Sequence, residues 1–271
     1  MDAQIYKGYK RIEGDTEFIN DYMANISPDN WAVNEYAVVK NTDDNTEKEM
    51  RWDGQKFVAL KLPPSKWIKG RNSLQRCALD MLINPNITIC FLPGVPGGGK
   101  TFQTVASGLY CIREKGYYSC LTIVREPISS GRTSGYLPGD LDDKIGLYFK
   151  PIEDQLGGGE FELHQLRQRG ELDVITPHYI KGRTLNSSYV LVEEAEDLTE
   201  KQARLIGTRV GAGSKIIFSG DYKQSEIDSS ENNVLLRMCE YFKGNPMCAV
   251  VFLEDDVRSE TSKLFANMYL G

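Results

Sequence analysis

Hydrophobic and polar positions along the chain follow two different patterns, which meet near residue 70. In the first part, a helical face begins after Asp15, and an apolar run at residues 35–40 is typical of a strand. Asp53-Gly54 separates two more apolar runs, and such a pair between two apolar segments favours a β-hairpin. These signals predict a small β-rich appendage over residues 1–70.

From residue 71 onward, short apolar runs alternate with helical stripes. The runs lie at residues 87–92, 120–124, 172–175, 189–192, 215–218 and 249–253. Continuous apolar runs of this length, joined by helices, are typical of parallel strands that are buried on both faces. We therefore expect an α/β domain over residues 71–271, with a mostly parallel sheet covered by helices on both faces.

A glycine-rich loop follows the first of these runs directly. It consists of Gly94, Val95, Pro96, Gly97, Gly98, Gly99, Lys100 and Thr101. Glycine lets backbone N–H groups approach a phosphate, the lysine reaches the β- and γ-phosphates, and the threonine hydroxyl can ligate Mg²⁺. The spacing predicts a P-loop that grips a nucleoside triphosphate. The alternative is a glycine-rich turn with a solvated lysine.

The helix expected after this loop would place its positive N-terminal dipole under the phosphates. Its apolar stripe ends at Gly116. The residues expected to be buried along it are Phe102, Val105, Ala106, Leu109 and Ile112. Phe102 directly follows the loop and is also a candidate nucleotide contact.

Two carboxylates, Glu193 and Glu194, stand at the end of the run 189–192. In a phosphohydrolase, the first of such a pair holds Mg²⁺ through a water, and the second orients or deprotonates the attacking water. A surface cluster of acidic residues is the alternative. Asp221 and Gln224 follow the next run. The glutamine amide can hydrogen-bond to both the γ-phosphate and the attacking water. Asp221 can hold the glutamine in place or contact the coordination shell of the metal.

These motifs and several longer segments, all in the same order, resemble the PhoH family of P-loop ATPases, relatives of superfamily 1 helicases. The matching segments, spread over residues 71–260, are Asn72 with Gln75, Gly131, Gly135–Asp140 with Lys144, Lys181–Asn186, Thr208–Gly211 with Ser214-Lys215, Gly220-Asp221 with Gln224, and Asp256–Arg258. The resemblance implies a RecA-like fold, with ATP as the nucleotide and Mg²⁺ as the metal.

The resemblance also suggests roles for single residues. Gln75 would read adenine ahead of the loop, and Glu194 and Gln224 would prepare the water. Arg209 and Arg258 are candidates to neutralise the γ-phosphate in the transition state, from the same chain or from a neighbouring one. For each of them the alternative is an ordinary surface arginine.

The chain departs from the family pattern at specific positions. The family's Asp-Glu-Ala-Gln is Glu193-Glu194-Ala195-Glu196 here, its Arg-Pro is Arg125-Glu126-Pro127, and the glutamate that usually follows Gly131 is Arg132. An anion at position 196 would repel the γ-phosphate unless an arginine neutralises it or the side chain is turned away. These changes bear on hydrolysis more than on nucleotide binding.

A net charge of −6 argues against a protein that coats nucleic acid with its whole surface, so any such contact must be local. Arg125, Lys181 and Arg183 lie on loops after predicted strands and could line a pore for single-stranded RNA or DNA. Solvated loop charges are the alternative. One RecA-like sheet lacks the second lobe of two-lobed helicases, so we expect a homo-hexameric ring with each site closed by its neighbour.

The leading hypothesis is an ATPase that couples hydrolysis to the binding or unwinding of single-stranded RNA or DNA. The altered acidic motif supports a second hypothesis, an ATP-dependent assembly module or switch with weak turnover. Kinases for small molecules share the loop, but the chain shows no evident acceptor-binding segment. Longer relatives carry an N-terminal PIN nuclease domain, for which seventy residues are too few, so no ribonuclease activity is expected.

Composition adds a few expectations. With 41% apolar residues, the chain can bury a sizeable core without disulfides or a structural metal. The six cysteines are scattered without a Cys-x-x-Cys pair, and no apolar run is long enough to span a bilayer. These features favour a reduced, cytoplasmic protein with no membrane contact.

Overall fold

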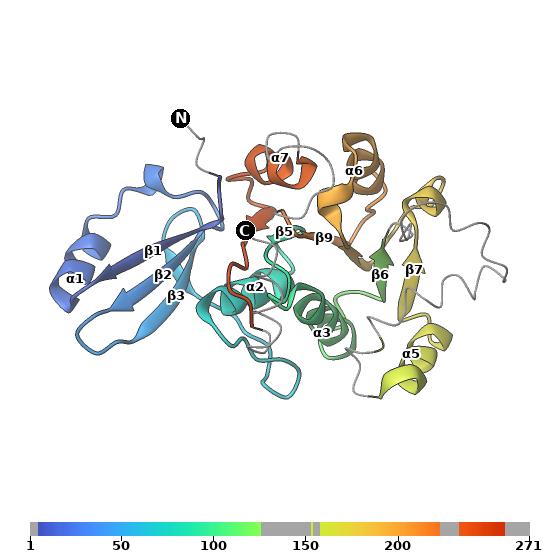
Figure 1. Ribbon diagram of the computed structural model, residues 1–271, viewed down its shortest axis with the longest axis horizontal. Coiled ribbons are helices and arrows are strands. Elements are labelled where there is room, and N and C mark those ends of the chain that lie inside the picture. Colours follow the sequence, from blue (N-terminus) through green and yellow to red (C-terminus); the bar gives the residue numbers. More distant parts are fainter. Residues whose placement is uncertain (1–4, 126–152, 154–157, 223–232, 258–271) are drawn as a thin grey trace, which may run out of the picture.

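The computed structural model describes residues 5–125, 153, 158–222 and 233–257. Their strands form two sheets (Figure 1). A four-stranded sheet has the order β1-β2-β3-β4, and a six-stranded sheet has the order β10-β5-β9-β8-β6-β7. The smaller sheet lies at one end of the molecule, and the larger sheet forms the centre of the remainder.

The N-terminal part contains the elements predicted for it, together with one strand and one 3-10 helix that were not predicted. The elements are β1 (Tyr9–Gly14), α1 (Thr16–Ala24), the 3-10 helix η1 (Pro28–Asn30), β2 (Tyr36–Asn41), β3 (Glu47–Trp52) and β4 (Phe57–Ala59). As predicted, Asp15 caps α1, and β3 and β4 pair antiparallel around Asp53-Gly54. The sequence patterns missed β1, which pairs in parallel with β2.

The larger sheet is parallel in all of its described pairings. Its strands are β5 (Ile89–Pro93), β6 (Cys120–Val124), β7 (Leu172–Ile175), β8 (Ser188–Val192), β9 (Lys215–Gly220) and β10 (Cys248–Val250). Each strand overlaps an apolar run that predicted it. The expected parallel α/β sheet is therefore confirmed.

Helices cover both faces of this sheet (Figure 1). α2 (Ser73–Ile83), α3 (Lys100–Arg113) and α5 (Gly159–Gln168) pack on one face, and α6 (Glu200–Gly207) and α7 (Val234–Tyr241) pack on the other. Alternate strand residues point to opposite faces, so the two faces bury separate apolar clusters. This is the RecA-like arrangement expected from the sequence. Among the described helices, none is long and apolar enough to cross a membrane.

α3 lies close to the sheet because small residues form the helix face that meets it. Ser107 and Gly108 are buried, and a Cβ at Gly108 would lie 2.9 Å from the ring of Tyr189 on β8. The prediction that Phe102 is buried was wrong, since this side chain is 44% exposed. Phe102 is two residues from the buried Thr104, a rotation of about 200° around the helix, so it points away from the sheet.

Buried polar contacts attach the smaller sheet to the larger one. Asp80 on α2 is fully buried and accepts hydrogen bonds from the Tyr36 hydroxyl (3.0 Å) and from Nε of Arg51 (3.0 Å). Asn34 donates to the carbonyl oxygens of Pro246 and Cys248, at 2.9 and 3.0 Å. A domain boundary at residue 70 stays a prediction, because these contacts join residues on both sides of it.

Candidate functional site

The predicted P-loop connects β5 to α3 at the carboxyl edge of the larger sheet. Gly97 and Gly99 have φ angles of 79° and 83°, in the left-handed region that residues with a Cβ rarely adopt. The Lys100 ammonium group donates to the carbonyl oxygens of Gly94 and Val95, at 2.8 and 3.0 Å. The loop thus curves over the start of α3, and the N–H groups at a helix N-terminus favour a bound anion.

A hydrogen bond joins the P-loop to the acidic pair. Oγ1 of Thr101 donates to Oε1 of Glu193 over 2.7 Å, and Glu193 is only 7% exposed. Thr101 follows β5 and Glu193 follows β8, with β9 alone between these strands in the sheet. The two residues predicted to hold Mg²⁺ therefore meet. Hydroxyl and carboxylate oxygens are the donors that Mg²⁺ prefers, so this pair fits the ion.

Arg125, at the end of β6, contacts both carboxylates of the pair. Its side chain is 12% exposed, Nη1 lies 3.3 Å from Oε2 of Glu193, and Nη2 donates to Oε1 of Glu194. A cation in this position offsets the mutual repulsion of two neighbouring carboxylates. The sequence suggested Arg125 as a nucleic-acid contact. The structure places it inside the candidate site, and a contact with nucleic acid stays a prediction.

Glu194 has a left-handed backbone conformation, with φ 52° and ψ 42°. A non-glycine residue in this conformation costs about 1 kcal/mol or more, and such residues cluster at functional sites. The Glu194 side chain is 44% exposed, far more than that of Glu193. Its carboxylate is therefore accessible to water, as the role of orienting a water requires.

Glu196 is turned into the site, against the end of β9. A Cβ at Gly220 would overlap Oε2 of Glu196, so the close approach requires glycine at that position. The backbone N–H of Asp221 donates to the Glu196 carboxyl group. Glu196 is 8% exposed, and burial raises its pKa above the usual value. Glu196, one of the residues that depart from the family motif, thus faces the same space as the P-loop.

These residues surround a cavity of about 310 Å³. Its lining consists of Pro96, Lys100, Thr101, Arg125, Glu193, Glu194, Glu196, Ser219, Gly220 and Asp221. The volume lies within the range of small-molecule pockets. The lining holds four carboxylates and two cationic side chains, so it would repel a polyanion unless a divalent cation accompanied it. The site fits a nucleoside triphosphate with Mg²⁺ better than a bare anion.

Comparison with known proteins identifies the family. The sequence model of the PhoH family, described as PhoH-like protein, matches residues 67–270. The chain belongs to the PhoH family. Protein PhoH2 of Bacillus subtilis (strain 168) is 35% identical over 214 residues, which cover 74% of this chain and 47% of that protein. A PhoH-like protein of the same organism is 32% identical over 153 residues, which cover 56% of this chain and 48% of the relative.

The chain spans about half the length of the curated PhoH2 relatives that it matches. Among solved structures, a Sulfolobus solfataricus SWI2/SNF2 ATPase core in complex with dsDNA aligns with 66% of this chain and 36% of that chain. Its TM-score is 0.39 and its identity is 15%, a likeness too weak to support an inference. Family membership makes the chain a P-loop ATPase-like protein.

The side chains of two glutamines, Gln75 and Gln103, donate hydrogen bonds to the P-loop backbone. Nε2 of Gln75 donates to the Gly98 carbonyl oxygen (3.1 Å), and its Oε1 accepts from the N–H of Arg71 (2.8 Å). Gln103, which the sequence reasoning missed, is buried on α3 and donates to the same carbonyl at 3.5 Å. Both polar atoms of the Gln75 amide therefore bond to the protein, and the adenine contact expected from the PhoH pattern stays a prediction.

Arg209 lies at the opposite edge of the sheet. It comes between α6 and β9, and its carbonyl oxygen accepts from the N–H of Leu185, just before β8. β8 has five residues, which corresponds to roughly 17 Å, so the length of this strand separates Arg209 from Glu193. Within one chain, Arg209 does not join the other site residues.

Lys181 and Arg183 are exposed on the segment between the 3-10 helix η2 (Pro177–Ile180) and β8. Arg183 forms an ion pair of 2.8 Å with Asp173 on β7. Neither cation lines the cavity beside the P-loop. Their contact with nucleic acid therefore stays a prediction.

Some predicted positions lie outside the described residues. They are Gln224, Arg258, Arg132 and the family segments from Gly131 to Lys144. Asp221, by contrast, is described and lines the cavity.

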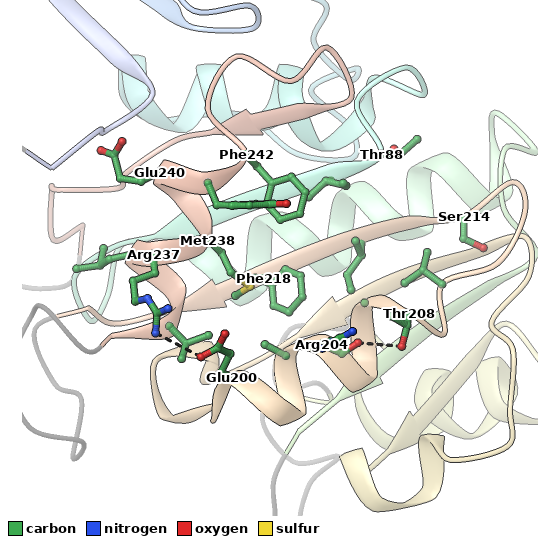
Figure 2. A pocket seen from close by; sticks show the side chains of 18 of the residues that line it. Thr88, Glu200, Arg204, Thr208, Ser214, Phe218, Arg237, Met238, Glu240 and Phe242 are labelled. Carbon is green, nitrogen blue, oxygen red and sulfur yellow. Dashed lines mark hydrogen bonds and ion pairs between the residues drawn. The ribbon is translucent and has the colours of Figure 1, made fainter.

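A larger cavity of about 1430 Å³ lies on the sheet face covered by α6 and α7 (Figure 2). Phe218 of β9 and Phe242 face into it, and an ion pair of 3.5 Å between Glu200 and Arg237 links the two helices at its rim. None of the predicted site residues lines this cavity. Among the described residues, those predicted to hold the phosphates and the metal, Lys100, Thr101 and Glu193, line the smaller cavity instead.

Replacing Glu196 with glutamine, the residue of the PhoH motif, should strengthen ATP binding at high pH. Burial raises the Glu196 pKa, so the wild-type side chain is neutral below this raised value and becomes an anion as the pH rises through it. The anion repels the triphosphate. Above the raised pKa, Glu196→Gln should lower the ATP Kd about tenfold, and below it the two proteins should bind alike.

Titration calorimetry with Mg²⁺ and ATP at a series of pH values measures this difference. Glu200→Gln, on the exposed start of α6, is the matched control and should follow the wild-type curve. A constant ratio between the Kd values of Glu196→Gln and wild type at every pH would contradict the assignment of the repulsion to Glu196.

Proposed function

We propose that this chain binds ATP with Mg²⁺ and hydrolyses it. ATP would lie across Gly94–Thr101, with its γ-phosphate in the cavity beside Glu194 and with adenine near Gln75. The proposal rests chiefly on the hydrogen bond between Thr101 and Glu193, which unites the P-loop and the acidic pair. A glycine-rich turn with a solvated lysine would not be expected to line one cavity with these carboxylates.

Individual side chains would then have distinct roles. Thr101 would ligate the metal directly and Glu193 would hold it through a water; when bound, Mg²⁺ supplies the positive charge that the phosphates need. Lys100 would exchange its carbonyl partners for phosphate oxygens. Glu194 would orient or deprotonate the attacking water, together with Gln224.

We further propose that six chains form a ring that binds or unwinds single-stranded RNA or DNA. The position of Arg209 supports the ring, because it lies a strand's length away from its own P-loop. In the ring, Arg209 would act on a neighbour's site and neutralise γ-phosphate charge alone or together with Arg258. Arg125, Lys181 and Arg183 remain the candidates for the nucleic-acid contact.

The contacts of Glu194 favour one alternative function, an ATP-dependent assembly module or switch with weak turnover. Arg125 forms an ion pair with Glu194, and Glu196 adds a further carboxyl group to the same cavity. Both features would slow hydrolysis without preventing ATP binding. ATP would then hold an assembly together or switch its state.

Phosphate release separates the two functions. For the ATPase, the wild-type chain should release phosphate faster when single-stranded RNA is added, and Glu194→Gln should reduce release about a hundredfold, the size of a lost general base. Glu200→Gln serves as the control for loss of a carboxylate outside the cavity beside the P-loop. If wild type and Glu194→Gln are equally inert while both still bind ATP, the switch is the correct function.

Mixing two inactive variants tests whether Arg209 acts on a neighbouring chain. Arg209→Ala and Glu194→Gln should each, alone, release phosphate at about a hundredth of the wild-type rate or less. In mixed rings, a site with an intact Glu194 can face a neighbour with an intact Arg209, so about a quarter of the sites should recover activity at equal mixing. Light scattering should show a mass six times that of one chain. No recovery on mixing, or a fully active monomer, would contradict the ring.

A further inference from the structure

The segment after β10, residues 251–257, runs beside the P-loop and is hydrogen-bonded to it. The N–H of Leu253 donates to the Pro93 carbonyl oxygen (2.8 Å), and its own carbonyl oxygen accepts from the N–H of Val95 (3.0 Å). Four residues later, the N–H of Val257 donates to the carbonyl oxygen of Gly97 (3.2 Å). A Cβ at Gly98 would lie 3.2 Å from Cβ of Leu253. The conformation of the P-loop therefore depends on where residues 253–257 are held.

Residues from the N-terminal part of the chain contact this same segment through its side chains. The Lys7 ammonium group lies 2.6 Å from Oε1 of Glu254, and the Tyr9 hydroxyl donates to Oε2 of the same carboxylate. The Asn72 side chain, at the start of α2, donates to Oδ2 of Asp255 over 3.1 Å. Glu254 and Asp255 are thus both anchored.

The backbone beside these side chains is held as well. The N–H of Phe252 donates to the Lys7 carbonyl oxygen (3.3 Å), and the N–H of Tyr36 on β2 donates to the Gly8 carbonyl oxygen (2.9 Å). Gly8 has φ 76°, and a Cβ there would overlap the main chain of Val250 on β10. The chain that leads into β1 is therefore in direct contact with both sheets.

We propose that Lys7 and Tyr9 position the P-loop for the nucleotide through Glu254, so that the smaller sheet sets the affinity of the site. This inference rests on the proposed nucleotide binding for its effect, but the contact itself is independent of any nucleotide. Lys7 and Tyr9 are positioning residues, since they act on the loop through Phe252 and Glu254, the neighbours of Leu253.

The electrostatics of Glu254 support this role. Burial opposes ionisation, yet the hydrogen bonds from Lys7 and Tyr9 outweigh it and hold the Glu254 pKa below its ordinary value. The carboxylate is therefore bound as an anion between its two partners. By contrast, the ion pair between Glu13 on β1 and Lys40 on β2 is exposed and joins two strands of the smaller sheet. It offers a matched comparison within the same sheet.

A reciprocal effect follows from this coupling. If the contact at Glu254 raises nucleotide affinity, a bound nucleotide must strengthen the contact by the same factor. A partner that binds the smaller sheet would likewise change the affinity of a site to which it makes no contact.

Hydrogen exchange in the nucleotide-free protein tests the contact first. Tyr9→Phe and Glu254→Ala should accelerate exchange of the amides of residues 94–99 about fivefold, while amides of the central strand β8 exchange as in wild type. Glu13→Ala should change neither region. Unchanged exchange at residues 94–99 in a folded Tyr9→Phe protein, which lacks a single hydroxyl, would overturn the proposal.

Binding of a fluorescent ATP analogue tests the effect. Tyr9→Phe should weaken its binding about fivefold, and Glu254→Ala, which also removes the Lys7 contact, should weaken it at least as much. The double variant should bind no more weakly than Glu254→Ala alone, because that substitution already removes the contact with Tyr9. Kd values equal to wild type, with only a lower Tm, would show that the contact contributes to stability alone, and they would overturn the proposal. If wild type itself binds no analogue but exchange at residues 94–99 responds as expected, the nucleotide function fails while the positioning of the loop stands.

Discussion

The hydrogen bond from the Thr101 hydroxyl to the Glu193 carboxylate is the contact on which the candidate site depends. It can form only because β5 and β8 run parallel with a single strand between them, so that the loops that follow both strands begin at the same edge of the sheet. The small residues on the inner face of α3 bring this helix near the sheet and put Thr101 within reach. The packing of the apolar core therefore determines the distance between Thr101 and Glu193.

Charge is the second constraint on the site. Four carboxylates and two cations line one cavity of about 310 Å³. Arg125 offsets part of the excess by contacting Glu193 and Glu194 together, and burial raises the Glu196 pKa so that this residue carries a charge less readily. A metal–nucleotide complex would complete the balance, which explains how a cavity rich in carboxylates can still suit a triphosphate.

The strands of the larger sheet and the P-loop could be predicted because their signals are local: a continuous apolar run, or a motif with fixed spacing. Features that depend on distant neighbours could not. β1 has only two apolar residues, Tyr9 and Ile12, and is a strand because β2 lies beside it. Phe102 points outward because the following residues of α3, Gln103, Thr104 and Val105, face the protein interior. Arg125 enters the site because β6 is the neighbour of β8, an order that no local pattern encodes.

The dependence of ATP binding on Mg²⁺ tests the central assignment most directly. Calorimetry would compare the ATP Kd of the wild-type chain in excess Mg²⁺ with the Kd in excess chelator. If Thr101 and Glu193 hold the metal that makes this acidic cavity accept a triphosphate, removing the metal should weaken binding at least about tenfold. Equal affinity with and without Mg²⁺ would contradict the assignment.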